Sequence, residues 1–440
     1  MLNNMTIVKN SLLSTYWTLL LLALAPIQAQ VVVDTTFHKK IMTYSDYIEA
    51  VAQNNLSYAA EKLNINIAQA AIEKAKIIPD PAFNTGLFNN DQQHMKMGYG
   101  YDIGLDWTLE LGGKRKARID LAKSESELAQ YALQYFFQRL RAEATMHYLT
   151  ALHQEQLVKL QLSSYEALDQ LAKSDSVREK LGAITAIDAT QSKLEAASMW
   201  NQVIQSIGHW KSALGNLDLL MGSKRIAAVT STSGDFSTFN RNFHLHDLIE
   251  QAQLYRSDLL YALQHQDASQ KMLKLANVNR IIDLGINTGL TRNAAARNEI
   301  APSPAFTATN IGISIPLKFS NKQKGELKEA YYAQQQSAVQ YKQIELQVHT
   351  EVINAYYQYE ATQKQLQQFN TGLLQNAEAI LKGKRYSYER GESSLLEVLL
   401  AQRTYIEIQQ HYYETLFNNA AALVELERSA GIWDIHFKRS

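Results

Sequence analysis

The second half of this chain repeats the first half at an almost constant spacing. Lys114 and Lys322 lie 208 residues apart, and so do Glu143 and Glu351. After one inserted residue the spacing becomes 209, as in the pairs Gly182 and Gly391, Asp188 and Glu397, and Gly222 and Gly431. Self-similarity at a fixed spacing over so long a stretch is the signature of an internal duplication. Whatever unit the first half forms, we expect the second half to form again.

Strict alternation of apolar and polar residues predicts a β-hairpin in each half. From 98 to 109, one face consists of Tyr, Ile, Leu and Trp, and the other consists of Gly, Asp and Thr. A period of two is typical of a strand with one apolar face and one wet face. A partner at 83–88 completes a hairpin within 82–109. Strands at 283–291 and 309–317 predict the second hairpin, within 283–317.

Each hairpin is followed by a stretch that predicts a very long helix. Residues 111–173 and 320–389 are rich in Ala, Gln, Glu and Leu and contain no proline. At 1.5 Å per residue the first of them would be about 90 Å long. Breaks near Gly182 and Gly391 precede a further helix in each half. The repeated unit is therefore helix, β-hairpin, very long helix, helix.

The N-terminus is typical of a targeting segment. Lys9 precedes an apolar run at 15–25, and a small residue, Ala29, precedes a polar one. This pattern predicts a secretory signal peptide, with a membrane anchor as the alternative. We therefore expect five segments along the chain: a signal peptide at 1–29, a first repeat at 41–222, a linker at 223–243, a second repeat at 244–431 and a C-terminal tail at 432–440.

Composition and motifs exclude several classes of function. The chain has 43 basic and 43 acidic residues, which argues against a nucleic-acid binder. It has no cysteine, so disulfides and thiolate metal sites are excluded. No hydrolase, phosphate-binding or zinc-protease motif is present. His94, Met95 and Met97 lack the spacing of a dedicated metal site. We therefore expect no enzyme, no cofactor and no metal site.

The hairpins pose a physical problem that a single chain cannot solve. Four strands cannot close a barrel, and an open sheet edge is not viable in hydrocarbon. If the apolar faces meet lipid, several chains must combine their hairpins, and three chains would give twelve strands around an aqueous lumen. The alternative is a soluble helical bundle or a coiled-coil adaptor in which the hairpins have no role in a membrane.

Three segments resemble the TolC-like outer-membrane efflux proteins. Residues 313–327 (ISIPLKFSNKQKGEL) look like the family's strand-to-helix junction, and their pattern looks closest to the heavy-metal branch, the cobalt–zinc–cadmium and copper–silver systems. Residues 181–188 (LGAITAID) and 391–399 (GESSLLEVL) look like the two helix-turn tips. The resemblance covers about residues 41–432.

The resemblance implies an α+β membrane protein in the bacterial outer membrane. It is expected to be a homotrimer, with a 12-stranded β-barrel continuous with a periplasmic α-helical barrel. It would dock with a periplasmic adaptor and an inner-membrane pump of the RND type, and small toxic solutes or metal ions would leave passively through it. The alternative is a duct for type I polypeptide secretion, paired with an ATP-driven ABC transporter.

The resemblance also assigns roles to individual residues. Asp188 and Tyr388 match members of the network that closes the periplasmic end, although Ser393 stands where an arginine is expected. Glu397 matches a carboxylate lining the constriction, where three copies would favour cations, while Leu400 occupies the place of a second carboxylate. The alternative is that Glu397 is an ordinary acidic residue on the solvent-exposed surface of a helix.

Two further groups complete the expected sites. Glycine permits a tight break between helices, so the turns at Gly182 and Gly391 are candidates for adaptor docking or are simple helix hairpins. A basic cluster beside Trp107 suits lipid headgroups at the membrane interface, and a solvated helix start is the alternative. Its members are Lys114, Arg115, Lys116 and Arg118, with Lys318, Lys322 and Lys324 in the matching place of the second half.

Overall fold

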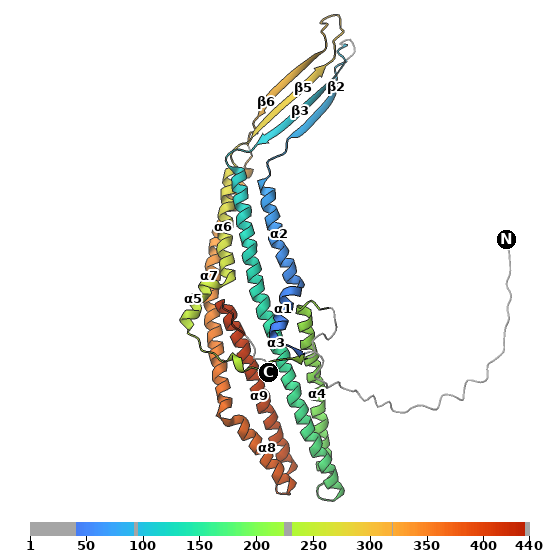
Figure 1. Ribbon diagram of the computed structural model, residues 1–440, viewed down its shortest axis with the longest axis vertical. Helices are drawn as coiled ribbons and strands as arrows, with labels where there is room; N and C mark the ends of the chain where they lie inside the picture. The colour runs from blue at the N-terminus through green and yellow to red at the C-terminus, as the bar shows by residue number, and fades with distance from the viewer. Residues whose placement is uncertain (1–40, 92–95, 224–230, 319, 436–440) are drawn as a thin grey trace, which may run out of the picture. The chain divides into compact units, whose positions relative to one another are not determined.

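The two predicted hairpins join into one four-stranded antiparallel sheet (Figure 1). A computed structural model describes residues 41–91, 96–223, 231–318 and 320–435. The strand order is β2-β3-β5-β6, so the first hairpin meets the second through β3 and β5. The bounds are β2 Ala82–Asn89, β3 Tyr99–Leu109, β5 Leu284–Asn293 and β6 Phe306–Ser314. Strands β2 and β6 are the two edges.

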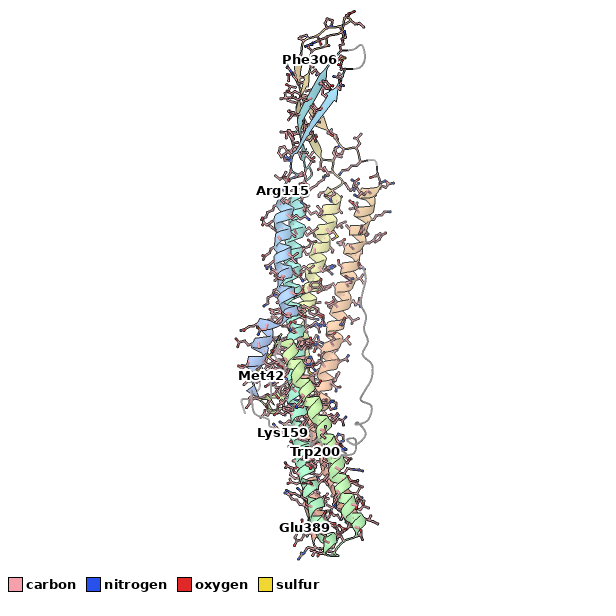
Figure 2. All side chains as sticks on the ribbon, turned by 90° about the vertical axis from the view of Figure 1, so that its right-hand side faces the viewer. Met42, Arg115, Lys159, Trp200, Phe306 and Glu389 are labelled. Carbon is pink, nitrogen blue, oxygen red and sulfur yellow. The ribbon has the colours of Figure 1, made fainter. Side chains whose placement is uncertain are left out.

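The helices follow the duplicated plan. Each half contributes a short helix, a medium helix before its hairpin, a long helix after it and a returning helix. The bounds are α1 Tyr44–Asn54, α2 Leu56–Lys76, α3 Lys114–Lys180, α4 Ala186–Leu220, α5 Leu245–Tyr255, α6 Ser257–Val278, α7 Lys322–Gln368, α8 Leu374–Glu389 and α9 Leu395–Ala430. The sheet, with Phe306, lies at one end of these helices, and the α3–α4 and α8–α9 turns, with Glu389, lie at the other (Figure 1 and Figure 2). Within the described ranges, no helix combines the length and the apolar character needed to cross a membrane.

The prediction of one unbroken helix over 320–389 is wrong. A π-type segment, Phe369–Leu373, separates α7 from α8, and Gly372 within it has φ of 99°. Figure 1 shows α8 leaving the line of α7 at this point. The matching helix α3 runs through 67 residues without such a break.

The duplication extends to the way the helices pack. The glycine that ends α4, Gly222, lies against the backbone of Asn54, where α1 meets α2. The glycine that ends α9, Gly431, lies in the same way against the backbone of Arg256, where α5 meets α6. Each returning helix therefore ends on the joint between the first two helices of its own half.

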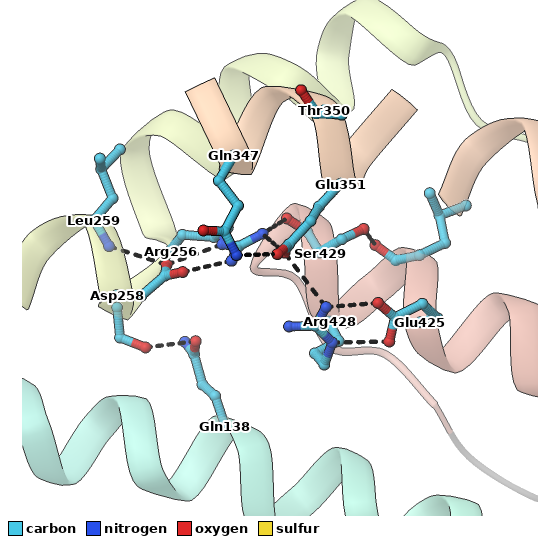
Figure 3. A network of polar contacts seen from close by, with 12 residues as sticks. Gln138, Arg256, Asp258, Leu259, Gln347, Thr350, Glu351, Glu425, Arg428 and Ser429 are labelled. Atoms are coloured by element: carbon cyan, nitrogen blue, oxygen red, sulfur yellow. Dashed lines mark hydrogen bonds and ion pairs between the residues drawn. The ribbon is translucent and has the colours of Figure 1, made fainter. Parts of the chain in front are cut away.

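Arg256 is the centre of a polar network that holds the second of these joints (Figure 3). Its guanidinium forms ion pairs with Asp258 on α6 and Glu351 on α7, at 2.5 and 2.7 Å, and donates a hydrogen bond to the Ser429 carbonyl on α9. Arg428 joins the network through Glu351 at 3.4 Å. One buried arginine thus ties three helices together.

Two stretches that flank the repeat helices, one at Met42 and one within 231–241, are anchored on the long helices by tyrosine hydroxyls. Tyr148 on α3 donates to the carbonyl oxygens of Met42 and Ser233, beside the short parallel pair β1 (Ile41–Met42) and β4 (Ser231–Thr232). Tyr359 on α7 donates to the carbonyls of Phe239 and Arg241. The expected linker 223–243 is therefore fixed to both halves where it is described. The expected signal peptide and residues 436–440 of the expected tail lie outside the described residues.

Candidate functional site

One face of the sheet carries most of the apolar side chains that the sheet leaves exposed, together with Thr85, Thr288 and Arg292. The register places Phe83 beside Leu105 and Leu87 beside Tyr101 on the same face. The exposed fraction reaches 88% for Leu87 and 79% for Ile311. Contiguous apolar surface of this kind marks a place where lipid or protein binds. The edges β2 and β6 also present backbone groups that the sheet itself does not pair.

The opposite face is mainly polar, with Phe88 and Phe306 near one end, and several of its side chains lie across glycines of the neighbouring strands. Asp102 occupies the space in which a Cβ on Gly86 would stand, and Asn310 does the same at Gly289. Asn84 donates to the Asp106 carboxylate at 2.5 Å. Polar side chains that cover the glycines make this face hydrophilic, and they stay close to the sheet. One sheet thus carries an apolar and a wet face, as the alternation predicts.

Most side chains of the basic cluster at the start of α3 form hydrogen bonds or ion pairs with other residues of this chain. The Lys114 ammonium is buried and lies 2.6 Å from Asp283, so it meets a carboxylate rather than open surface. Arg115 is exposed but donates through Nε to the Lys76 carbonyl. Trp107 donates through its indole nitrogen to the Pro79 carbonyl. Lys116 is exposed, and it is the member whose charge points outward among those described.

Arg118, the fourth member of this basic cluster, completes the junction between sheet and helices. It makes a bidentate ion pair with Glu110 at 2.6 and 3.0 Å and donates to the carbonyls of Ala75 and Ile77. Carbonyls at the end of a helix lack intrahelical donors, so a guanidinium placed there satisfies them. The contacts of Arg118 therefore link α2, the end of β3 and α3 at this junction.

At the opposite end, two glycines form the tight turns between paired helices. Gly182 has φ of 72° and Gly391 has φ of 76°, a backbone region that favours glycine. Thr185 and Ser394 then cap α4 and α9 by accepting from the amides of Asp188 and Glu397. Large apolar side chains beside the turns are exposed: Leu181 78%, Ile187 78% and Leu396 58%. Two matching tips therefore present apolar side chains to the surroundings.

Tyr388 connects α8 to α3 near these tips. Its hydroxyl donates to a carboxylate oxygen of Asp175 at 2.9 Å, and Asp175 is fully buried. The Arg178 guanidinium lies 4.5 Å from the centre of the Tyr388 ring and donates to the Tyr388 carbonyl. Burial, followed by the hydrogen bond to Asp175 and its negative charge, raises the pKa of Tyr388 well above its normal value. The phenol therefore stays protonated and remains a donor at neutral pH.

The structure does not pair Asp188 with Tyr388. The Asp188 carboxylate accepts from the hydroxyl of its own cap, Thr185, at 2.7 Å. Glu397 forms an ion pair with Lys384 on α8 at 2.5 Å, and both side chains are 45% exposed. The hydrogen bond from Lys384 and its positive charge lower the pKa of Glu397. Ser393, in the turn before α9, donates to the Lys384 carbonyl and so ties that turn to α8.

Sequence reasoning missed Asp175 and Lys384, the partners that complete these contacts. Asp175 and Arg178 stand three residues apart on one helix, a spacing that brings side chains to the same face. That spacing was the available signal, but it is common on solvated helices. In the described part of the chain, no group of three or more His, Asp and Glu side chains is placed to hold a metal ion. His94 and Met95 lie outside the described residues.

Comparisons with known proteins agree with this geometry. The family model described as outer membrane efflux protein matches residues 47–223 and 248–432. The chain is 23% identical over 397 residues to the cobalt–zinc–cadmium resistance protein CzcC of Cupriavidus metallidurans, covering 89% of this chain and 90% of that protein.

Solved structures share the fold over most of the chain. The Campylobacter jejuni CmeC outer membrane channel has a TM-score of 0.74 at 14% identity, covering 88% of this chain and 85% of that one. The open state of the Neisseria gonorrhoeae MtrE outer membrane channel has a TM-score of 0.67 at 15% identity, covering 88% of each chain. Because the family model matches both halves, this chain belongs to the outer membrane efflux protein family, the non-enzymatic outer-membrane channel components of tripartite efflux systems.

Proposed function

We propose that three copies of this chain combine their sheets into one twelve-stranded barrel. The observation that carries this proposal is the pairing of an exposed apolar face with two open sheet edges. In hydrocarbon, each unpaired backbone group would cost several kcal/mol, so β2 of one copy would pair with β6 of the next. The wet face with Asp102 and Asn310 would then line the lumen. Trp107 and Lys116 would lie near the lipid headgroups at the periplasmic rim.

The detergent-extracted protein is therefore expected to have a protein mass close to three chains, each of at most 49.7 kDa. Light scattering corrected for detergent measures this mass. Ile311→Arg, on the apolar face, should reduce the trimer recovered from outer membranes, because arginine facing lipid costs about 2–4 kcal/mol at the bilayer midplane. Asn310→Arg, one residue along on the wet face, is the matched control and should leave recovery unchanged. A monomer in solution, or equal effects of both variants, would contradict the barrel.

The cargo we propose is metal ions or other small toxic solutes delivered by an RND-type pump through a periplasmic adaptor. The similarity to a protein named for cobalt, zinc and cadmium resistance supports this choice over polypeptide secretion with an ABC transporter. The tips at Gly182 and Gly391, with their exposed apolar neighbours, are the proposed docking surface for the adaptor. A deletion strain that becomes sensitive to cobalt, zinc or cadmium would support metal export. Loss of a secreted polypeptide with unchanged metal tolerance would instead favour a role in polypeptide secretion with an ABC transporter.

The gate we propose lies at the same end as the tips and involves Asp188, Tyr388 and Glu397. Tyr388 holds α8 against the buried Asp175, which supports its role in closure. Asp188 lies close enough for its charge to act on the Tyr388 phenol. Glu397 would line the constriction, and its ion pair with Lys384 would neutralise much of the cation preference of three bare carboxylates.

Variants of this ion pair should change ion selectivity in opposite directions. Lys384→Ala leaves three uncompensated carboxylates and should increase cation preference, whereas Glu397→Ala leaves three lysines and should decrease it. Reversal potentials across planar bilayers in a salt gradient measure both. Lys382→Ala removes an exposed lysine two residues away, paired with Glu378, and serves as the control. If ion selectivity and conductance were unchanged in both variants, Glu397 would not line the constriction.

A further inference from the structure

The two hairpins correspond residue by residue. The run NTGL occurs once in β2 and once in β5, 203 residues apart, and β3 and β6 keep the spacing of 208 found at the start of the long helices. In the structure, β2 pairs Gly86 with Asp102 on β3. Strand β5 pairs Gly289 with Asn310 on β6, which stand 203 and 208 residues further along the chain. Each position of one hairpin therefore has a known counterpart in the other.

This correspondence relates the centre of the sheet to its two edges. The halves meet where β3 of the first pairs with β5 of the second, a contact that we call the β3–β5 seam. The counterparts of these two strands are β6 and β2, which are the edges of the sheet. Strands lie 4.7–4.9 Å apart, so the two edges of one sheet are about 14 Å apart and cannot pair with each other. The counterpart of the seam can therefore form only between two copies of the chain.

An ion pair lies at the helical end of the β3–β5 seam. Lys114 lies 2.6 Å from Asp283, and the two side chains are 6% and 25% exposed. The residue 208 positions after Lys114 is Lys322, and the residue 203 positions before Asp283 is Asp80. Lys322 is 76% exposed, with one carboxylate of its own helix at 3.8 Å. Asp80 is exposed and has no hydrogen bond or ion pair in the described part of the chain. The same lysine–aspartate pair is thus formed at the seam and left open at the edges.

A second ion pair repeats between the helices with its charges exchanged. Asp120 on α3 lies 4.0 Å from Lys274 on α6. The residue 208 positions after Asp120 is Lys328 on α7, and because α2 and α6 begin 201 residues apart, the counterpart of Lys274 is Glu73 on α2. Both counterparts are exposed, and the partner of Glu73 among the described residues is Lys76 of its own helix. Opposite charges kept in exchanged order suit two positions that face each other.

We propose that β6 of one copy pairs with β2 of the next copy in the register of the β3–β5 seam. Two ion pairs hold this contact, from Lys322 to Asp80 of the next copy and from Lys328 to Glu73 of the next copy. The inference rests on the proposed barrel and adds which residues of the two copies meet. The partner is a second copy of this chain, because the complementary charges are those that the chain already uses within itself.

The register can be stated for each strand position. Ile103 lies directly opposite Leu290 in the β3–β5 seam, so Ile311 should lie directly opposite Leu87 of the next copy. A slip of one residue would turn the apolar face of one copy toward the wet side of the other. A slip of two residues would keep both faces matched. The apolar pattern alone therefore does not choose between these registers, whereas the lysine–aspartate pair does.

Cysteine cross-linking tests the register, and the chain has no cysteine of its own. Ile311→Cys combined with Leu87→Cys should link chains covalently under mild oxidation, as seen on non-reducing gels, because opposite Cβ atoms lie about 4.5–5.5 Å apart. Ile311→Cys with Phe83→Cys is the matched control. Phe83 lies on the same exposed face but about 13 Å further along β2, so linking should be roughly tenfold less. Ile103→Cys with Leu290→Cys should close within one chain and leave its mass unchanged.

Charge exchange tests the ion pair itself. Lys322→Glu brings two carboxylates together and Asp80→Lys brings two ammonium groups together, so each should speed trimer dissociation in detergent about tenfold. The double variant restores opposite charges and should restore the slow dissociation. Lys324→Glu, at an exposed lysine two residues along α7, is the matched control and should leave the rate unchanged.

The outcomes separate this register from the barrel itself. A stable trimer in which Ile311→Cys links to Phe83→Cys, or to neither cysteine, would overturn the register and leave the barrel standing. Unchanged dissociation in both single charge variants, or no recovery in the double variant, would overturn the ion pair between Lys322 and Asp80. A protein that is a monomer in detergent would remove the barrel and the contact between copies together.

Discussion

Replacing Arg256 with methionine is expected to lower the free energy of unfolding by about 3 kcal/mol. The Arg256 side chain is 5% exposed and contacts Asp258 and Glu351, which are 17% and 26% exposed. Methionine fills a similar volume but removes the guanidinium from Asp258, Glu351 and the Ser429 carbonyl. Among the described residues, Asp258 keeps only the Leu259 amide as a donor, and Glu351 keeps only Gln347 and Arg428. Removing one partner of a buried ion pair costs about 3–5 kcal/mol, and the partial exposure of the carboxylates places this site at the lower end. Urea unfolding in detergent, followed by the helix signal in circular dichroism, measures the loss.

Arg428→Met is the matched control for this prediction. Arg428 is 26% exposed and lies at the rim of the same network, with Glu425 at 2.5 Å and Glu351 at 3.4 Å. Exposed pairs contribute about 0–1 kcal/mol, so this variant should lose far less stability. Equal losses in the two variants would show that Arg256 is not the centre of the network.

The same network predicts how stability depends on acid pH. Burial raises the pKa of Glu351, but hydrogen bonds from Gln347 and Arg256 and the charges of Arg256 and Arg428 outweigh it, so the pKa lies below its normal value. A carboxyl whose pKa is lowered by folding stabilises the protein above its unfolded pKa, and that contribution is lost as pH falls through the lowered value. Arg256→Met should therefore weaken the dependence on pH below about pH 4.5.

Replacing Tyr388 with phenylalanine is expected to open the channel. The change removes the hydrogen-bond donor to Asp175, whose second carboxylate oxygen has no hydrogen-bond partner among the described residues. Leaving a buried acceptor unsatisfied costs about 1–3 kcal/mol. If that cost falls on the closed state, a loss of about 2 kcal/mol shifts the ratio of closed to open channels roughly 30-fold. Open probability in planar bilayers measures the shift.

A double variant isolates the Tyr388–Asp175 contact from any other effect of the substitution. Asp175→Ala removes the buried carboxylate, so adding Tyr388→Phe to it should change open probability much less than Tyr388→Phe does alone. Tyr386→Phe, at an exposed tyrosine on the same helix, should leave the channel closed. Additive effects of the Tyr388 and Asp175 changes would show that this contact does not hold the closed state.

The sequence by itself determined the repeated unit, the alternating strands and the positions of the two tips. These features depend on local periods of two and about 3.6 residues, which are readable wherever a strand or helix has one face unlike the other. The confirmed alternation at Tyr99–Leu109 and the glycines at 182 and 391 are of this kind. The one-residue change in spacing was also visible in the sequence.

The tertiary structure alone decided which side chains meet. The Tyr388 hydroxyl donates to Asp175, whereas Asp188 accepts from Thr185. Glu397 forms an ion pair with Lys384, and Lys114 forms one with Asp283. Successive residues of a helix point about 100° apart, so the direction of a side chain near the end of α3 depends on how the whole helix is packed. For the same reason the inserted residue could have formed a loop or a π-type turn. The structure shows the turn, at Gly372 beside the contact of Phe369 with Tyr412 of α9, and with it the place where the second repeat bends and the first does not.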